Sequence, residues 1–243
     1  MDVFKILDNI KDHIKKYGLD SFKIGFVGNG EPLLNFSELR TYIEYISEEL
    51  KNGIISAYTI TNGVSLTEEM LLFFKEHNVN VGFSIDGLKD IHDKWRCSSH
   101  DKVMNNIELY RKINGKYPSM NCTVGEDVIS RTEETIAFFE QFNNRVAFSR
   151  MIGGYGIPMP EFEQFMIRAK TRLNVRTGGY DCTMYGGLCG AGINNLFYAN
   201  GKIYICGNCI DLGMSFPYTT PLDEVNFNIS SFDRTRCFKE SLT

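Results

Sequence analysis

Residues 22–34 read FKIGFVGNGEPLL. The apolar run at 22–28 predicts a buried β-strand that ends in glycine, and the following turn closes with Pro32, which lacks the backbone N–H that a central strand needs. Apolar residues three and four positions apart predict a helix at 36–50 after the turn and another at 3–16 before the strand. The stretch is therefore the centre of a helix–strand–turn–helix unit.

The same unit repeats along the chain. Further strands are predicted at 56–63, 79–87, 120–125 and 145–152, and further helices near 65–77, 101–114, 130–142 and 160–173. Ser65 with Glu68, and Ser130 with Glu133, have the spacing of a capping box at the start of two of these helices. Strands that alternate with helices pack as a parallel sheet through right-handed crossovers, so the fold class is α/β with about five strands visible.

Polar and glycine-rich segments follow each predicted strand. They read GNGEP, TNG, SIDG, VGED and RMIGGYG in chain order. In parallel sheets with helical crossovers, ligands bind at the carboxyl ends of the strands. These five segments are therefore the predicted rim of a functional site.

Composition excludes two classes of protein. The 243 residues carry a net charge of −4, and 43% of them are hydrophobic. A nucleic-acid-binding surface needs clustered Lys and Arg. A membrane span needs about 20 consecutive apolar residues. The sequence contains neither pattern. The first residues are amphipathic and charged, unlike a signal peptide, so we expect a cytoplasmic protein.

Seven cysteines are unevenly distributed, and five of them lie in the last 62 residues. From residue 178 the chain is rich in glycine and cysteine, and it contains a predicted hairpin that turns at Asn200 and Gly201. We therefore divide the chain into an α/β domain at 1–177 and a small cysteine-bearing appendage at 178–243. In a reducing compartment such clustering favours a metal site, either an iron–sulfur cluster or Cys₄ zinc.

Four stretches together resemble one family. Residues 28–34 resemble the motif GGEPLL with Asn29 interposed, residues 61–63 resemble a turn motif after the next strand, and residues 84–96 (SIDGLKDIHDKWR) resemble a third motif. A fourth stretch matches the opening of a SPASM extension. In it, eleven residues separate Cys189 from Gly201, and four residues separate Gly201 from Cys206. The chain resembles the radical S-adenosylmethionine (SAM) enzymes with a SPASM or twitch extension, which include anaerobic sulfatase-maturing enzymes and peptide maturases.

The resemblance implies a fold, cofactors and site residues. It implies a partial (βα)6 barrel, SAM as cofactor, one auxiliary [4Fe-4S] cluster in the appendage, and a peptide or protein as substrate. By resemblance the SAM-binding residues are Gly30, Glu31, Pro32, Asn62, Ser84, Asp86 and Arg96. The cluster ligands implied in the same way are Cys182, Cys189 and Cys206, with Cys209 or Cys237 as the fourth, and zinc is the alternative occupant. His92 is expected to be structural.

One family motif is missing from the 243 residues. The catalytic cluster of these enzymes is held by C-x-x-x-C-x-x-C after the first barrel strand, and that pattern occurs nowhere in the sequence. We therefore expect a fragment or a degenerate paralogue that is inactive alone, whose sheet has an exposed edge where the first strand would pair. The alternatives are a non-catalytic protein that binds SAM, a peptide or a partner maturase, and a zinc-stabilised α/β domain. The oligomeric state is left open.

Overall fold

The computed structural model describes residues 2–27, 30–176, 180–229 and 231–242. Its first part alternates helices and strands, as the sequence predicts. The strands are β1 (Phe22–Phe26), β2 (Ile55–Thr61), β3 (Val79–Ser84), β4 (Ser119–Val124) and β5 (Val146–Arg150). The helices are α1 (Val3–Tyr17), α2 (Phe36–Tyr45), α3 (Ser47–Lys51), α4 (Glu68–Glu76), α5 (Lys89–Trp95), α6 (His100–Asn114), α7 (Glu126–Ser130), α8 (Thr132–Glu140) and α9 (Met159–Lys170), with a 3₁₀ turn η1 (Pro32–Asn35) after β1.

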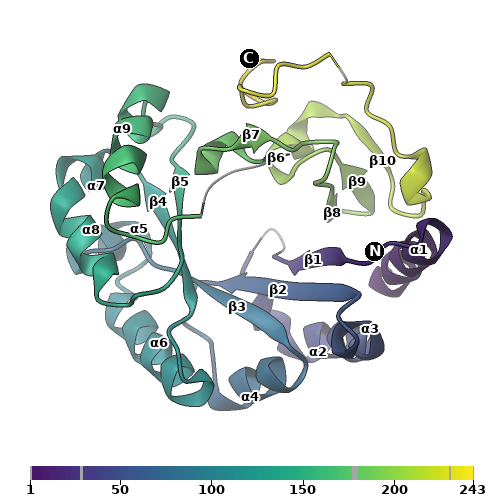
Figure 1. The fold of residues 1–243 in the computed structure, drawn as a ribbon, viewed down its shortest axis with the longest axis horizontal. Helices are drawn as coiled ribbons and strands as arrows, with labels where there is room; N and C mark the ends of the chain where they lie inside the picture. Colours follow the sequence, from purple (N-terminus) through teal and green to yellow (C-terminus); the bar gives the residue numbers. More distant parts are fainter. Residues whose placement is uncertain (1, 28–29, 177–179, 230, 243) are drawn as a thin grey trace.

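The five strands form one parallel sheet in the order β1-β2-β3-β4-β5. The sheet is curled, and helices α2 to α9 lie around its convex side (Figure 1). Side chains alternate between its faces, so that Val79, Val81 and Phe83 of β3 are buried toward the helices, while Asn80 on the other face is exposed. The α/β fold with five parallel strands is therefore confirmed, as a half-barrel whose concave face is polar.

Local details differ from the prediction at three places. The helix expected at 36–50 is broken at Ile46, which has φ −106° and ψ 17° between α2 and α3. Helix α4 is capped by Thr67, whose side chain accepts a hydrogen bond from Met70 N, so the capping box at Ser65 is wrong. The capping box at Ser130 is also wrong, because Ser130 is the last residue of α7 and its hydroxyl donates to Asp127 O.

The C-terminal part forms a small layer beside the half-barrel. Strands β8 (Phe197–Ala199), β9 (Lys202–Tyr204) and β10 (Ser215–Pro217) pair antiparallel, and β6 (Tyr180–Asp181) pairs with β7 (Leu188–Cys189). The 3₁₀ turns are η2 (Thr183–Tyr185), η3 (Gly207–Leu212) and η4 (Leu222–Glu224). Asn200 and Gly201 have φ of 50° and 73°, which confirms the positive-φ turn expected from the sequence. The boundary between 177 and 178 stays a prediction, because residues 177–179 lie outside the described residues.

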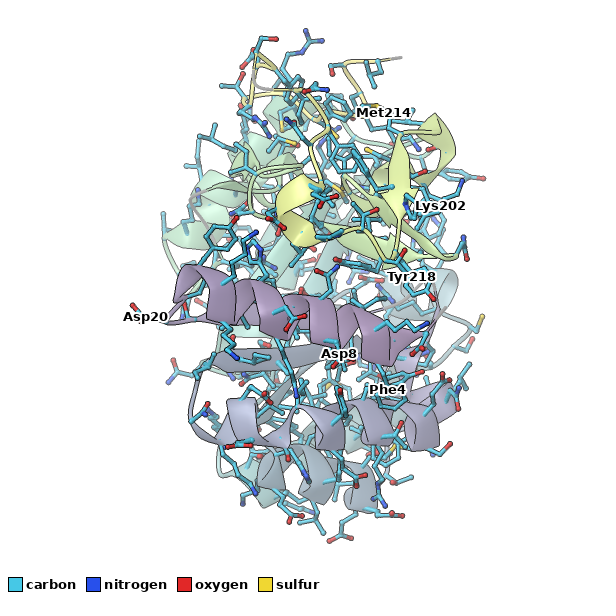
Figure 2. The ribbon with its side chains drawn as sticks, turned by 90° about the vertical axis from the view of Figure 1, so that its right-hand side faces the viewer. Phe4, Asp8, Asp20, Lys202, Met214 and Tyr218 are labelled. Atoms are coloured by element: carbon cyan, nitrogen blue, oxygen red, sulfur yellow. The ribbon has the colours of Figure 1, made fainter. Side chains whose placement is uncertain are left out.

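The C-terminal layer packs against the N-terminal helix. The side chain of Asn9 on α1 donates to Thr220 O at 2.7 Å and accepts from Leu222 N at 3.3 Å, and Lys16 pairs with Asp223. Figure 2 shows α1 between the C-terminal layer, with Tyr218 facing it, and the helices of the half-barrel. Tyr198, Tyr218 and Leu222 also contact the main apolar core. The layer therefore lies beside β1, at the side of the sheet where the sequence predicts an open edge (Figure 1).

Both parts of the chain are stabilised by clusters of buried apolar side chains. The main core joins α1, the outer face of the sheet and the surrounding helices, and it includes fully buried Phe74, Phe83, Phe139, Phe148 and Phe162. A second, smaller cluster in the C-terminal part contains Cys189, Ala191, Ile205, Cys209 and Phe238. Within the described ranges, no helix has the length and apolar character needed to cross a membrane.

Candidate functional site

The predicted rim segments lie at the carboxyl ends of neighbouring strands. The loop after β1 contains Gly30 and Glu31, and the loop after β2 contains Asn62. The loop after β3 contains Asp86, and Ser84 is the half-buried last residue of that strand. Since β1, β2 and β3 are adjacent and parallel, these loops meet at one edge of the sheet. Gly28 and Asn29, the start of the first motif, lie outside the described residues.

Glu31 ties the first two loops together. Its carboxylate accepts hydrogen bonds from the Thr61 hydroxyl at 2.6 Å and from Asn62 N at 2.7 Å. It also accepts from Leu33 N at 3.2 Å, which caps the 3₁₀ turn that starts at Pro32. Thr61 is buried, and its oxygen in turn accepts from Gly63 N at 3.0 Å. Both Glu31 oxygens are therefore engaged by protein donors, and the carboxylate holds the rim in shape.

Asp86 and Arg96 bind each other. Asp86 is 4% exposed, and the Arg96 guanidinium donates to its two oxygens at 2.5 and 3.2 Å. Asp86 also accepts from Thr123 N at 2.9 Å, which joins the loop after β3 to the end of β4. The planar fork of Arg96 is thus directed at a carboxylate of the protein itself. The sequence singles out both residues by resemblance, but it does not show that they are partners.

His92 fixes the loop between Asp86 and Arg96. It is fully buried, its Nδ1 accepts from Asp86 N at 3.2 Å, and its Nε2 donates to the Ser99 hydroxyl at 3.0 Å. The Ser99 hydroxyl in turn donates to Arg96 O at 2.7 Å. Burial lowers the pKa of His92 to about 4, so the ring is neutral near pH 7 and can accept from Asp86 N.

We expect the stability of the protein to fall in mild acid because of His92. Its pKa is about 4 when folded and about 6.5 when unfolded, so the unfolded chain takes up the proton first. The contribution is fully present above pH 6.5, and it decreases by about 2 kcal/mol between pH 7 and pH 5. Urea unfolding at the two pH values should show this loss in the parent chain and a smaller one in His92→Gln. An equal loss in both proteins would contradict the assignment.

Arg150 was not singled out by sequence reasoning. It is the last residue of β5 and is 7% exposed, and it donates to Ile157 O at 2.9 Å. Its second amino group contacts both oxygens of Glu240 at 2.5 and 2.7 Å. This ion pair joins the rim to a segment ninety positions later in the chain. An arginine near the end of the predicted strand RVAFSRMI was the available signal.

Removing the partner of Arg150 should loosen the C-terminal segment. Glu240→Gln leaves a buried guanidinium without its carboxylate, which we expect to lower the free energy of unfolding by about 2 kcal/mol. It should also increase the rate of proteolysis within residues 218–242. Glu224→Gln, an exposed change in the same part of the chain, is the matched control. The assignment is wrong when both variants are cleaved at the parent rate.

The cysteines of the C-terminal part interact with one another. The pKa of Cys182 is raised to about 12, first by burial and then by the neighbouring Cys206, Cys237 and Cys189, against a backbone hydrogen bond from Met184 that lowers it. The Cys209 thiol donates to Cys206, and the pKa of Cys206 is lowered to about 6 by this bond and by backbone N–H groups of residues 207 and 208. Sulfur donors of this kind suit an iron–sulfur cluster or zinc. No group of three His, Cys, Asp or Glu side chains in the described part is arranged to hold a metal ion, so the ligand set stays a prediction.

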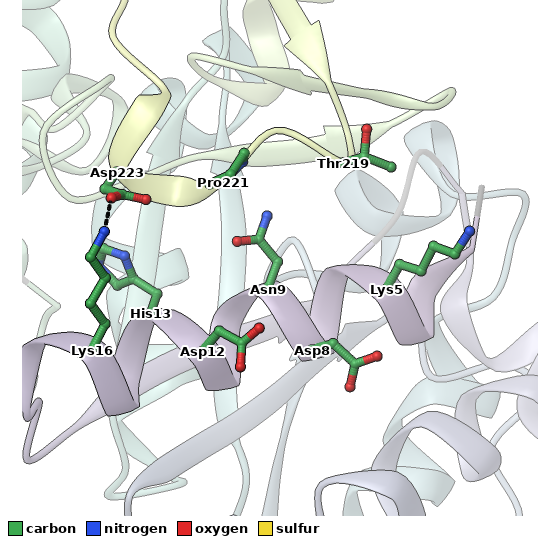
Figure 3. A pocket seen from close by; sticks show the side chains of 9 residues that line it. All are labelled: Lys5, Asp8, Asn9, Asp12, His13, Lys16, Thr219, Pro221 and Asp223. Carbon is green, nitrogen blue, oxygen red and sulfur yellow. Dashed lines mark hydrogen bonds and ion pairs between the residues drawn. The ribbon is translucent and has the colours of Figure 1, made fainter.

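A shallow groove lies where α1 meets the C-terminal part. It has a volume of about 390 Å³ and is lined by α1 and by residues 219–223 (Figure 3). Asp8 and Asp12 carry charges opposite to those of Lys5 and Lys16, and Asp223 pairs with Lys16. The groove is therefore a seam of mixed charge between two packed parts.

Comparison with known proteins identifies the family. The model of the radical SAM superfamily matches residues 2–139, more than half of the chain. A cysteine-type anaerobic sulfatase-maturating enzyme of Clostridium novyi is 32% identical over 119 residues, which are 46% of this chain and 32% of that enzyme. A serine-type anaerobic sulfatase-maturating enzyme of Bacteroides thetaiotaomicron is 42% identical over 65 residues, which are 25% of this chain and 16% of that enzyme.

Solved structures show the same fold. Native anSMEcpe with bound AdoMet has a TM-score of 0.68 at 18% identity, over 90% of this chain and 69% of that one. Streptococcus suis SuiB bound to S-adenosylmethionine has a TM-score of 0.65 at 14% identity, over 90% of this chain and 56% of that one. The sequence matches to the two sulfatase-maturating enzymes span a third of their length or less. Sequence match, fold and rim motifs agree, and the chain belongs to the radical SAM superfamily.

Proposed function

We propose that this chain is the SAM-binding body of a peptide- or protein-maturing radical SAM protein, with an auxiliary cluster in its C-terminal part. The observation that carries the proposal is the rim at the carboxyl ends of β1, β2 and β3. There Glu31 joins the first two predicted SAM-binding segments, and Asp86 joins the third to the end of β4. Sulfatase-maturating enzymes among the relatives, and structures of anSMEcpe with bound AdoMet and Cp18Cys peptide, support the substrate class.

The residues of the rim have separate tasks in this proposal. Backbone carbonyls near Gly30 and Glu31 would accept hydrogen bonds from the ammonium group of SAM, and the Ser84 hydroxyl would contact its ribose. Glu31 and the Asp86–Arg96 pair act on the ligand through the backbone they fix, because both carboxylates already accept hydrogen bonds from protein donors. Pro32 starts the 3₁₀ turn, and Asn62 Oδ1 accepts from Val64 N at 2.9 Å, so both shape the loops.

Cleavage of SAM is not assigned to these 243 residues. In the superfamily a [4Fe-4S] cluster held by C-x-x-x-C-x-x-C supplies the electron for that step, and this sequence contains no such motif. The cysteines of the C-terminal part fit the proposed auxiliary cluster by donor type, with Cys182, Cys189 and Cys206 and either Cys209 or Cys237 as ligands. The chain alone should therefore bind SAM without cleaving it.

Two measurements on the same sample test the proposal. After anaerobic reconstitution, we expect about four irons with matching sulfide per chain, and calorimetry should show SAM binding without release of 5′-deoxyadenosine. Cys189→Ala and Cys206→Ala should lose the iron, whereas Cys97→Ala, at an exposed cysteine elsewhere, should keep it. Zinc in place of iron would overturn the cluster, and absence of SAM binding would overturn the role of the rim.

A further inference from the structure

A second cavity lies at the opposite, amino ends of the strands. It has a volume of about 360 Å³ and is bounded by the concave face of the sheet and by the loops that lead into β4 and β5. Lys23, Tyr58, Asn80 and Asn121 belong to the strands that line it. The proposed SAM-binding rim does not use any of these residues.

All charged side chains in the described lining of this cavity are positive. Lys23, Lys116, Arg145 and Arg176 line it, and the described lining residues include no Asp or Glu. This contrasts with the whole chain, whose net charge is −4. Lys116 and Arg145 are exposed, and neither forms an ion pair within the part of the chain that the structure describes. A concave surface with charges of one sign concentrates ligands of the opposite sign.

Neutral hydrogen-bonding groups complete the lining. Asn80, Ser119 and Asn121 line the cavity together with the cations. Gly82 lies on β3 opposite Ser119 of β4, and a Cβ atom there would be 3.1 Å from Asn121 Nδ2 and 3.4 Å from Ser119 Oγ. The absence of a side chain at position 82 thus keeps room beside two polar groups. A Cβ at Gly25 would lie 2.5 Å from the Tyr58 ring, so that glycine lets the ring lie across β1.

We propose that this cavity binds the oxyanion group, phosphate or carboxylate, of a small ligand. The guanidinium of Arg145 matches the paired oxygens of either group, and Lys116 adds a second positive charge to the same lining. Amide and hydroxyl groups on β3 and β4 supply neutral hydrogen bonds to the rest of the ligand. A volume of about 360 Å³ lies within the range of small-molecule sites.

Calorimetric titration with pyrophosphate and with citrate tests the proposal. It also distinguishes a phosphate ligand from a carboxylate ligand. Binding of either probe supports it and shows which oxyanion is preferred. The double variant Lys116→Gln/Arg145→Gln should weaken binding by about tenfold or more. The control Lys102→Gln/Lys170→Gln removes the same charge from exposed helix positions outside the cavity and should bind like the parent.

A third variant tests the cavity without changing charge. Gly82→Ala places a methyl group against Asn121 and Ser119, and it should also weaken binding, while circular dichroism confirms that the fold is retained. The proposal is overturned when neither probe binds. It is also overturned when the cavity variant and the control variant lose affinity equally, because binding would then follow overall charge.

Discussion

Glu31→Gln should lower the free energy of unfolding by about 2 kcal/mol and weaken SAM binding by about tenfold. The carboxylate accepts three hydrogen bonds, from Leu33 N, the Thr61 hydroxyl and Asn62 N. An amide has only one acceptor oxygen, so whichever way it turns, its NH₂ group faces Leu33 N–H or Asn62 N–H. The loops after β1 and β2 then lose the group that joins them. Urea unfolding and calorimetric titration with SAM measure the two effects.

Two further variants separate this role from general charge effects. Glu76→Gln removes a carboxylate at an exposed position of α4 and should change neither quantity. Thr61→Val removes one of the three donors and should cost about 1 kcal/mol of stability, less than the loss of the carboxylate itself. A Glu31→Gln protein as stable as the parent would show that the joined loops do not depend on this side chain.

The fold could be predicted because its signals are local and repeated. Each strand is a short apolar run, and each helix has apolar residues three and four apart, so the parallel order follows from the alternation. The starts of helices have weaker signals. Ser65 and Thr67 are both side chains that cap helices, and only the observed backbone shows that the helix begins after Thr67.

The rim was predicted more as a location than as a set of interactions. Motif resemblance placed Glu31, Asp86 and Arg96 at the carboxyl ends of the strands. It assigned all three residues to SAM binding, and the structure adds their partners within the protein: Glu31 binds a residue thirty positions away, and Asp86 binds Arg96. Arg150 and Glu240 are ninety positions apart, and no periodic pattern connects them. Contacts of this kind depend on the packing of the C-terminal part, which local sequence does not encode.

Asp86→Ala should lower the free energy of unfolding by about 3 kcal/mol, because it leaves a partly buried guanidinium and the Thr123 N–H without their acceptor. Arg96→Ala should also destabilise the protein, since the carboxylate of the buried Asp86 then keeps only one hydrogen-bond donor, Thr123 N. A double-mutant cycle isolates the pair, and we expect a coupling energy of about 2 kcal/mol. Asp20→Ala, at an exposed position after α1, is the control and should have little effect.

The cycle also decides how the loop after β3 is held. Asp86 receives hydrogen bonds from Arg96 and from the end of β4, while its own N–H is bound by His92, so one residue connects three segments. If the two single effects add to within about 0.5 kcal/mol, Asp86 and Arg96 act independently, and Arg96 is free to serve a ligand carboxylate as the family motif implies. A large coupling instead means that Arg96 holds the loop, and SAM binding should fall in both single variants to a similar extent.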